Sequence, residues 1–343
     1  MFPVSETISL TLTIFTDYYL LQLTGFVYQQ YLILVCSIWV FVMKYRKLGR
    51  SDIIVSVIGL GTAFRRGITQ FSLEVIRRSL DLGVKFIDTA EGYNEGKSEE
   101  LIGKAIAEQP REVIVATKVA PTHLSYDDVL KSADGSLTRL NIDTIDLYQI
   151  HQPNPKFPIR DTMRAMEYLV DEGKVRHIGV SNFSLNQMKD AQQAMSKYDL
   201  VSNQVEYNLL NKGITGMGID MYELLPYCQK EEIEIIAYRP IGCGILSGKY
   251  GNIEEIPKGH IKSSNSYFQG PSFQKNKRIA EELRYIGQKY DRTPAQVALN
   301  WLISQPHVVA IPGAENPDQV YELIHGASWK LSEADVYRIN NLN

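Results

Sequence analysis

The chain has 343 residues, of which 22% are charged and 44% are hydrophobic, and its formal net charge is −3. This balance is typical of a globular protein with a sizeable core, and it argues against a nucleic-acid partner, which would require a basic face. The three cysteines (Cys36, Cys228 and Cys243) are too few and too scattered for a disulfide scaffold or a zinc site. We expect them to pack as small hydrophobic residues, and a redox role stays open for Cys243 alone.

The first 42 residues differ in composition from the rest of the chain. No charged residue occurs from Tyr18 to Met43, and basic residues begin at Lys44. An apolar run of this length predicts a membrane-spanning segment, with the following domain in the cytoplasm. Met43 also stands where that domain begins, so residues 1–42 are alternatively an upstream translation that the cellular protein lacks. Both interpretations stay open. The predicted organisation is a hydrophobic extension, residues 1–42, followed by a cytoplasmic domain, residues 43–343. If the extension is real, residues 18–43 would tether this domain to a membrane.

Eight short apolar runs follow, and they alternate with amphipathic stretches. The runs cover residues 55–60, 84–88, 113–118, 145–150, 175–180, 201–206, 234–239 and 308–312. Their nearly continuous hydrophobicity is typical of parallel strands that are buried on both faces. Alternating strands and helices predict a parallel sheet, and eight repeats predict its closure into a (β/α)8 TIM barrel.

Start and stop signals predict several of the intervening helices. Ser72, Ser98 and Ser125 each precede an amphipathic run, and Gly83 stands where a helix C-cap is expected. Between the last two strands, about 70 residues replace the usual repeat of about 30. This stretch contains a polar segment, residues 251–274, and two helical patterns, residues 274–290 and 293–305. We expect the polar segment to be a lid or cofactor clamp, although a tolerated surface insertion remains the alternative.

Four polar residues occur at or just after the ends of consecutive predicted strands: Asp88, Tyr93, Lys118 and His151. Asp88 and Lys118 are 30 residues apart, and Lys118 and His151 are 33 apart, close to the length of one strand–helix unit. Active sites of eight-stranded barrels lie at the C-terminal ends of the strands. Each residue alone has a structural explanation, such as a turn or a buried ion pair. Their joint spacing predicts a proton-transfer site.

Nine ordered segments from Met43 to Trp329 resemble the aldo-keto reductase superfamily, among them FIDTAEGYNEGKSEELIGKAI, IDLYQIHQP, GKVRHIGVSNFS and AYRPIGCGILSGKY. The resemblance implies a barrel that reduces aldehydes or ketones with NADPH, or in some members NADH, and needs no metal. It implies that Tyr93 donates a proton, that Lys118 favours the phenolate, and that Asp88 orients Lys118. It also implies that His151 holds the carbonyl oxygen, so that Tyr93 and His151 contact the substrate.

The resemblance further implies a set of cofactor contacts. An amide pair and a serine would hold the nicotinamide carboxamide, a tyrosine would stack on its ring, and a glycine-rich segment would wrap the pyrophosphate. The amide pair and serine are Asn182, Gln204 and Ser181, and the stacking residue is Tyr238. The full expected set is Gly61, Thr62, Asp88, Ser181, Asn182, Gln204, Tyr238, Arg239, Pro240, Gly242, Gly244, Leu246, Lys249, Gly313, Glu315, Gln319 and Glu322.

The chain departs from the family pattern at the adenosine end of this set. Glu315 stands where relatives often carry Arg, Lys or Ser, and Gln319 stands where they often carry Arg. A carboxylate repels a 2′-phosphate and accepts hydrogen bonds from a ribose hydroxyl instead. NADPH remains the prediction, with Lys275 or Lys277 as the cation for the 2′-phosphate, and NADH stays open.

Two further departures affect the pocket itself. Arg239 replaces a common serine, a change that the sequence does not explain, and Gln152 replaces a frequent tryptophan, which predicts a more polar substrate wall. The predicted partner is a small carbonyl substrate. Two other functions remain alternatives: a regulatory subunit of the potassium-channel type that uses bound cofactor as a redox input, and a barrel enzyme that uses Lys118 as a Schiff-base nucleophile.

Overall fold

The computed structural model describes residues 43–108, 112–256 and 265–342. Residues 1–42 lie outside the described residues, so the membrane-anchor interpretation and the domain boundary stay predictions. In the three described ranges, no helix combines the length and the apolar character that crossing a membrane requires.

The centre of the described chain is a barrel of eight parallel strands, which confirms the predicted fold class. The sheet runs in chain order from β3 to β10, and the parallel bridge between Ile58 and Ala310 brings its two edges together. Gly59 N donates to Ala310 O at 2.8 Å across this seam. The strands are β3 (Leu60–Gly61), β4 (Phe86–Asp88), β5 (Ile114–Val119), β6 (Ile145–Ile150), β7 (Val175–Ser181), β8 (Leu200–Glu206), β9 (Glu234–Tyr238) and β10 (Val308–Ile311).

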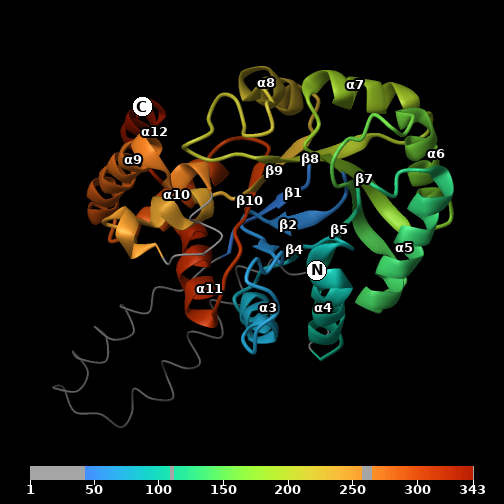
Figure 1. The fold of residues 1–343 in the computed structure, drawn as a ribbon, viewed down its shortest axis with the longest axis horizontal. Coiled ribbons are helices and arrows are strands. Elements are labelled where there is room, and N and C mark those ends of the chain that lie inside the picture. Colours follow the sequence, from blue (N-terminus) through green and yellow to red (C-terminus); the bar gives the residue numbers. More distant parts are fainter. Residues whose placement is uncertain (1–42, 109–111, 257–264, 343) are drawn as a thin grey trace, which may run out of the picture. The chain divides into compact units, whose positions relative to one another are not determined.

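Helices surround the strands, as Figure 1 shows, and cover the outer faces of the sheet. Those that follow successive strands are α3 (Ser72–Asp81), α4 (Lys97–Glu108), α5 (Tyr126–Leu140), α6 (Ile159–Asp171), α7 (Leu185–Ala194) and α8 (Met221–Lys230). Two helices lie between the last two strands, α9 (Gly270–Gln288) and α10 (Pro294–Ile303), and two follow them, α11 (Pro317–Ile324) and α12 (Glu333–Asn340). The two helical patterns predicted in the long connection are therefore confirmed.

The first predicted strand, residues 55–60, is wrong in its extent. Ile54–Ser56 forms β2, which pairs antiparallel with β1 (Tyr45–Lys47), and the barrel strand begins only after it. The hairpin closes the end of the barrel where the strands begin, because an added Cβ at Gly49 would lie 2.5 Å from Val201 O and 2.6 Å from Glu232 O. The apolar run is continuous in sequence because both parts are buried, although they belong to different sheets.

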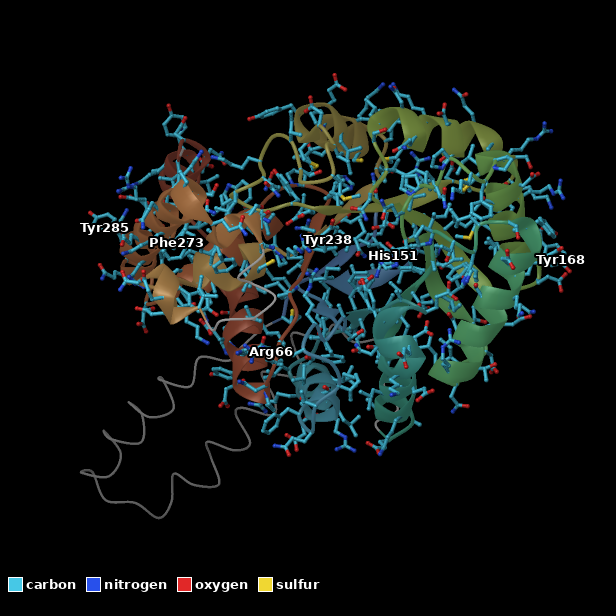
Figure 2. The ribbon with its side chains drawn as sticks, viewed as in Figure 1. Arg66, His151, Tyr168, Tyr238, Phe273 and Tyr285 are labelled. Carbon is cyan, nitrogen blue, oxygen red and sulfur yellow. The ribbon has the colours of Figure 1, made fainter. Side chains whose placement is uncertain are left out.

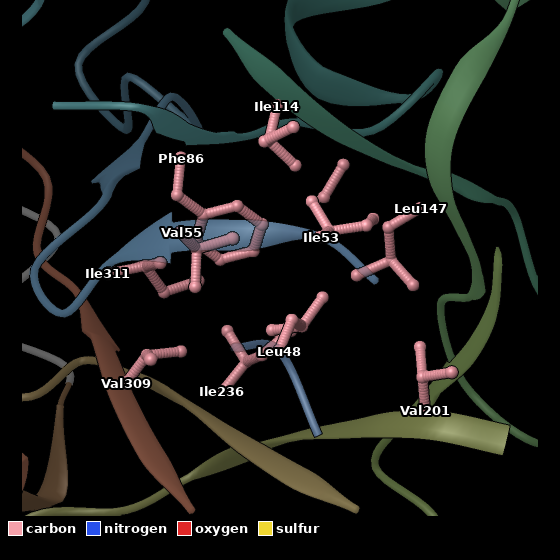
Figure 3. Packing of buried hydrophobic residues seen from close by; sticks show 11 residues of the cluster. Leu48, Ile53, Val55, Phe86, Ile114, Leu147, Val201, Ile236, Val309 and Ile311 are labelled. Carbon is pink, nitrogen blue, oxygen red and sulfur yellow. The ribbon is translucent and has the colours of Figure 1, made fainter. Parts of the chain in front are cut away.

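The core of the barrel is filled partly by this hairpin. Leu48, Ile53 and Val55 pack against apolar side chains that the strands direct inward, among them Phe86 and Ile236 (Figure 3). All of these side chains are almost completely excluded from water. Burying each contributes roughly 1.5–3 kcal/mol, so the hairpin is an integral part of the barrel core. The site therefore forms at the opposite end, where the strands finish.

The helix start signals are correct in one case and shifted in two. Ser125 caps α5 by accepting a hydrogen bond from Asp128 N, as predicted. Helix α3 begins at Ser72 rather than after it, and Gly83 follows in the left-handed conformation with φ +82°. Ser98 lies inside α4, where its hydroxyl donates to Thr62 O at 3.0 Å. A buried tertiary acceptor has replaced the local cap at Ser98.

Candidate active site

Asp88 and Lys118 form a buried ion pair at the C-terminal end of the barrel. Asp88 ends β4, and Lys118 lies next to the end of β5, with Lys118 Nζ 2.7 Å from Asp88 Oδ1. Lys118 also donates to Thr89 O at 2.6 Å, and Gln204 and Gln149 donate to Asp88 Oδ2 at 2.7 and 3.2 Å. The carboxylate thus accepts three side-chain hydrogen bonds, which stabilises its charged form without water.

Tyr93 and His151 stand beside this ion pair. Lys118 Nζ lies 5.0 Å from the centroid of the Tyr93 ring, and the Tyr93 and His151 rings meet edge to face with centroids 5.5 Å apart. His151 directly follows β6. The structure therefore brings together the four residues that were selected from their spacing.

The electrostatic environment of the cluster favours the charged form of the Lys118 amine and the neutral form of the His151 imidazole. Burial by itself lowers the pKa of Lys118, but Asp88 and then Tyr93 more than offset burial, so that its pKa is raised above the ordinary value. Burial, reinforced by the Lys118 ammonium, lowers the pKa of His151 to about 4. At neutral pH the imidazole is uncharged and keeps one ring N–H to donate.

The lowered pKa of His151 has a measurable consequence for the pH dependence of the expected carbonyl reduction. We expect kcat/KM to show no histidine titration near the ordinary value of about 6.5 and to fall only as the pH approaches about 4. The free energy of unfolding should also fall from about pH 6.5 toward 4, because the unfolded chain takes up the proton more readily. A pH–rate profile with a matched His151→Gln variant checks this. An acidic limb at pH 6–7 that disappears in the variant would contradict it.

The loop that carries Tyr93 is held in an unusual backbone conformation. Asn94, Glu95 and Gly96 have φ values of 51°, 59° and 86°, three left-handed residues in succession. Asn94 Nδ2 donates to Ala63 O at 3.0 Å and to Ser98 Oγ at 3.1 Å, which compensates the strain. The loop is thus tied to the segment after β3, and the position of the Tyr93 ring depends on contacts distant in sequence.

A second group of polar side chains lies across the barrel mouth. Tyr238, at the end of β9, donates its hydroxyl to Asn182 Oδ1 at 2.9 Å, and Asn182 Nδ2 donates to His151 O at 3.1 Å and to Ser181 Oγ at 3.0 Å. Burial, and next the charge of Glu206, raise the pKa of Tyr238 to about 12, so it stays a phenol. The predicted stacking residue Tyr238 is therefore hydrogen-bonded directly to Asn182, and through Asn182 it is connected to Ser181 and to the backbone of His151.

A cavity of about 790 Å³ opens beside the cluster and continues to the loop before α11. Figure 2 shows Tyr238 and His151 near the centre of the ring of strands and Arg66 farther out, near α11. Most of the predicted cofactor contacts line it, namely Gly61, Thr62, Asp88, Gln204, Tyr238, Arg239, Pro240, Gly244, Lys249, Gly313, Glu315, Gln319 and Glu322. Gly242 and Leu246 are instead buried behind the lining, and an added Cβ at Gly242 would meet Leu210 Cδ1 at 2.8 Å.

Arg239 takes part in a buried network that explains how this chain accommodates an arginine there. Strand pairing sets Glu206 opposite Tyr238, and Arg239 Nη1 lies 3.1 Å from Glu206 Oε2. Tyr267, in the last part of the polar segment (residues 251–274), donates to Glu206 Oε1 at 2.8 Å. Asn208 Nδ2 donates to Arg239 O at 3.0 Å and supports its left-handed φ of 49°. Residues 257–264 lie outside the described residues, so the lid expectation stays a prediction, but Tyr267 joins the end of this segment to the barrel.

The adenosine end of the predicted site holds a cation other than the two lysines expected there. Arg66 Nε lies 3.1 Å from Glu315 Oε1, and both residues line the cavity. Lys277 is instead oriented along α9, with its Nζ 3.9 Å from Glu281 Oε1, and neither Lys275 nor Lys277 is part of the cavity lining. The approach of Lys275 or Lys277 to a 2′-phosphate therefore stays a prediction, and the cavity lining of the described residues does not support it.

A dinucleotide cofactor fits this cavity on two grounds. The Nε of Arg239 is buried without a hydrogen-bond partner among the described residues, and Arg239 lines the cavity. A phosphate oxygen would satisfy that donor, and Lys249, Arg65 and Arg66 add positive charge to the same lining. The volume also lies within the usual range of ligand pockets, about 300–1,000 Å³. In the described ranges, His, Cys, Asp and Glu residues form no group of three that is suited to a metal ion.

Several residues of the site were not selected from the sequence. Gln149 and Glu206 are buried polar residues of β6 and β8, and a buried polar side chain in a hydrophobic strand requires a partner. The need for a partner could therefore have identified Gln149 and Glu206 as candidate site residues from the sequence. Arg65 and Arg66 follow β3 at the C-terminal face of the barrel. Active sites of such barrels lie at this face, and this position, which pointed to Asp88, points equally to the two arginines. Tyr267 has no comparable signal, because it reaches the site from a distant loop.

The fold and the buried ion pair beside a large cavity define a barrel enzyme. The model of the Aldo/keto reductase family matches residues 57–343, and the chain belongs to this family. It is 38% identical over 288 residues to an uncharacterized oxidoreductase of Mycobacterium tuberculosis, covering 81% of this chain and 86% of the relative. The chain is thus an oxidoreductase.

Two further matches bear on its function. A putative voltage-gated potassium channel subunit beta of Schizosaccharomyces pombe is 31% identical over 329 residues, covering 88% of this chain and 93% of that protein. The crystal structure of an aldo-keto reductase from Klebsiella pneumoniae in complex with NADPH is similar in fold, with a TM-score of 0.69 and 28% identity. It covers 88% of this chain and 95% of its own.

Proposed function

We propose that the protein reduces aldehydes and ketones to alcohols by hydride transfer from NADPH, with Tyr93 as the proton donor. The observation that carries this proposal is the cluster of Tyr93, His151 and the Lys118–Asp88 ion pair at one end of the cavity. Family membership supports the reaction type, and the Klebsiella pneumoniae neighbour supports the cofactor.

The cofactor, when bound, supplies a hydride to the carbonyl carbon. The residues of the chain orient the carbonyl oxygen and supply it with a proton. The His151 ring donates its N–H to the carbonyl oxygen and orients the substrate. Tyr93 then transfers its hydroxyl proton to the oxygen as negative charge develops there, and its own oxygen is left as a phenolate. The Lys118 ammonium, kept charged by Asp88, stabilises that phenolate until it regains a proton from water.

Other residues of the chain would hold the cofactor. Tyr238 offers a ring face for the nicotinamide, and Asn182 and Ser181 offer the donors and acceptors that its carboxamide requires. Gln204 has the same proposed role, in competition with its hydrogen bond to Asp88. Arg239 and Lys249 are the proposed phosphate contacts.

The proposal is tested by following consumption of NADPH and NADH by the purified protein with 4-nitrobenzaldehyde. We expect aldehyde-dependent oxidation and one alcohol formed per NADPH consumed. A reaction without aldehyde and one with the corresponding alcohol and NADP⁺ are the controls. Binding of NADPH without turnover of any small carbonyl would contradict the proposed reaction, and absence of binding would contradict the cofactor as well.

A regulatory role is the second candidate because a relative carries that name. The Schizosaccharomyces pombe protein is a putative channel subunit beta, and its similarity extends over most of both chains. A regulatory subunit would bind NADPH tightly, turn over slowly and co-purify with a membrane protein. Fast turnover of purified protein would favour the enzyme instead.

The Schiff-base alternative loses support from the environment of Lys118. A nucleophilic lysine must be neutral, and enzymes achieve this by lowering its pKa. Here the pKa of Lys118 is raised, because Asp88 and Tyr93 outweigh the effect of burial. Lys118 is also completely inaccessible to solvent, so a substrate carbonyl has no path to its Nζ.

A further inference from the structure

The ion pair between Arg66 and Glu315 joins two loops at the edge of the cavity. Arg66 belongs to the connection between β3 and α3, and Glu315 to the connection between β10 and α11. The side chains are 48% and 45% exposed, and both line the cavity. The pair is therefore accessible to a bound ligand, and Figure 2 shows Arg66 at a distance from Tyr238 and His151.

The backbone on each side holds these two side chains in place. Glu315 N donates to Gln319 Oε1 at 2.9 Å, and Gln319 N donates to Asn316 Oδ1 at 3.0 Å, which joins the Glu315 loop to the first turn of α11. The Arg66 loop is closed by a hydrogen bond from Gly67 N to Phe64 O at 2.7 Å. Both side chains thus extend from turns whose backbone is held by hydrogen bonds.

The neighbouring Arg65 also lines the cavity. Its positive charge opposes the rise in the pKa of the Tyr238 phenol. Of the two consecutive arginines, Arg66 is the one that forms an ion pair with Glu315, the carboxylate that argues against a 2′-phosphate.

The ion pair between Arg66 and Glu315 is weak enough for Arg66 to exchange Glu315 for a phosphate. A half-exposed ion pair contributes roughly 0–1 kcal/mol, since the carboxylate and the guanidinium both remain hydrated. A phosphate carries up to two negative charges, whereas the Glu315 carboxylate carries one, so the phosphate attracts the guanidinium more strongly. A phosphate at this position would therefore compete successfully for Arg66, whereas a ribose hydroxyl would leave the ion pair intact.

We propose that Arg66 binds the adenosine 2′-phosphate of NADPH and that Glu315 competes with that phosphate for the guanidinium. The preference of this chain for NADPH over NADH is then set by Arg66 and reduced by Glu315. This inference rests on the proposed function, because it requires a nicotinamide dinucleotide in the cavity. It gives Glu315 a role that is compatible with NADPH, and it places the specificity residue in the connection after the first barrel strand.

The test is equilibrium binding of NADPH and NADH to the full-length protein and to its Arg66→Met variant, followed by fluorescence. We expect Arg66→Met to weaken NADPH binding by about 10- to 100-fold, the range for a lost hydrogen bond to a charged group, and to change NADH binding by less than about threefold. Competition by 2′,5′-ADP should weaken in parallel, while competition by 5′-AMP should not. Glu315→Gln should strengthen NADPH binding, because it removes the competitor.

Arg338→Met is the matched control. Arg338 forms an ion pair with Glu282 at 2.6 Å, and the side chains of both residues are 42% exposed, but neither residue lines the cavity. It should leave both affinities unchanged. An unchanged ratio of NADPH to NADH affinity in Arg66→Met would overturn this inference alone, provided the wild-type protein binds NADPH and reduces an aldehyde. A wild-type protein that binds neither dinucleotide would overturn both this inference and the proposed function.

Discussion

The Tyr93→Phe variant is expected to lose about 10²–10⁴-fold in kcat/KM for an aldehyde while its affinity for NADPH stays nearly unchanged. A positioned general acid contributes a factor of this size, equivalent to about 3–5 kcal/mol of transition-state stabilisation. The ring of Tyr93 remains in the variant, so its edge-to-face contact with His151 is kept. Only the hydroxyl group that donates the proton is removed, and therefore kcat should fall while KM changes little.

The measurement is steady-state kinetics together with NADPH binding for wild-type, Tyr93→Phe and a control. Tyr198→Phe is a suitable control, because Tyr198 donates to Asp171 at 2.9 Å on the surface and should not affect turnover. Turnover retained by Tyr93→Phe would show that another group supplies the proton. A parallel loss of NADPH affinity would show that Tyr93 binds cofactor rather than acting as an acid.

The Lys118→Met variant is expected to lose turnover by at least about 10²-fold and also to lose about 3–5 kcal/mol of stability. Lys118 and Asp88 are both almost fully buried, with Nζ and Oδ1 2.7 Å apart. Removal of the ammonium leaves the Asp88 carboxylate with only amide partners, Gln149 and Gln204. An uncompensated buried charge is costly, and this loss is a substantial fraction of a typical total stability of about 5–15 kcal/mol.

The double variant Asp88→Asn, Lys118→Met separates the two effects. It removes both charges, so most of the stability should return, but the phenolate of Tyr93 still lacks its ammonium and turnover should stay low. Lys289→Met is the control, because Lys289 lies 2.7 Å from the buried Asp335 but is itself 46% exposed, and its loss should cost at most about 1 kcal/mol. Chemical denaturation would measure the free energy of unfolding of each variant. Recovery of activity in the double variant would contradict the role of Lys118 in stabilising the Tyr93 phenolate.

Sequence reasoning located the strands and the four clustered residues because both depend on local patterns. A buried parallel strand must be apolar throughout, and a residue at its end recurs with every strand–helix unit, as for Asp88 and Lys118. The first strand was misplaced for the same physical reason. Burial in the β1–β2 hairpin and burial in the barrel produce the same apolar run, and only the pairing of Tyr45 with Ser56 distinguishes them.

The role of Arg239 shows where local patterns stop being informative. The sequence places an arginine next to Tyr238, but its partner Glu206 lies 33 residues earlier and Tyr267 lies 28 residues later. The pairing of β8 with β9 brings the first into range, and the end of the long polar segment brings the second. Similarly, nothing in the sequence connects Arg66 to Glu315, which are separated by 249 residues.

The sequence by itself determined the barrel, the family resemblance and the identity of the proposed catalytic residues, because periodicity and strand-end position are properties of consecutive residues. The tertiary structure alone decided that Arg239 meets Glu206 and that Arg66 meets Glu315, whereas the meeting of Lys118 with Asp88 was already expected from the family resemblance. Electrostatic interactions act over a few ångströms of space without regard to separation along the chain. The charge on Lys118, the neutrality of His151 and the proposed preference for NADPH therefore depend on how the barrel closes.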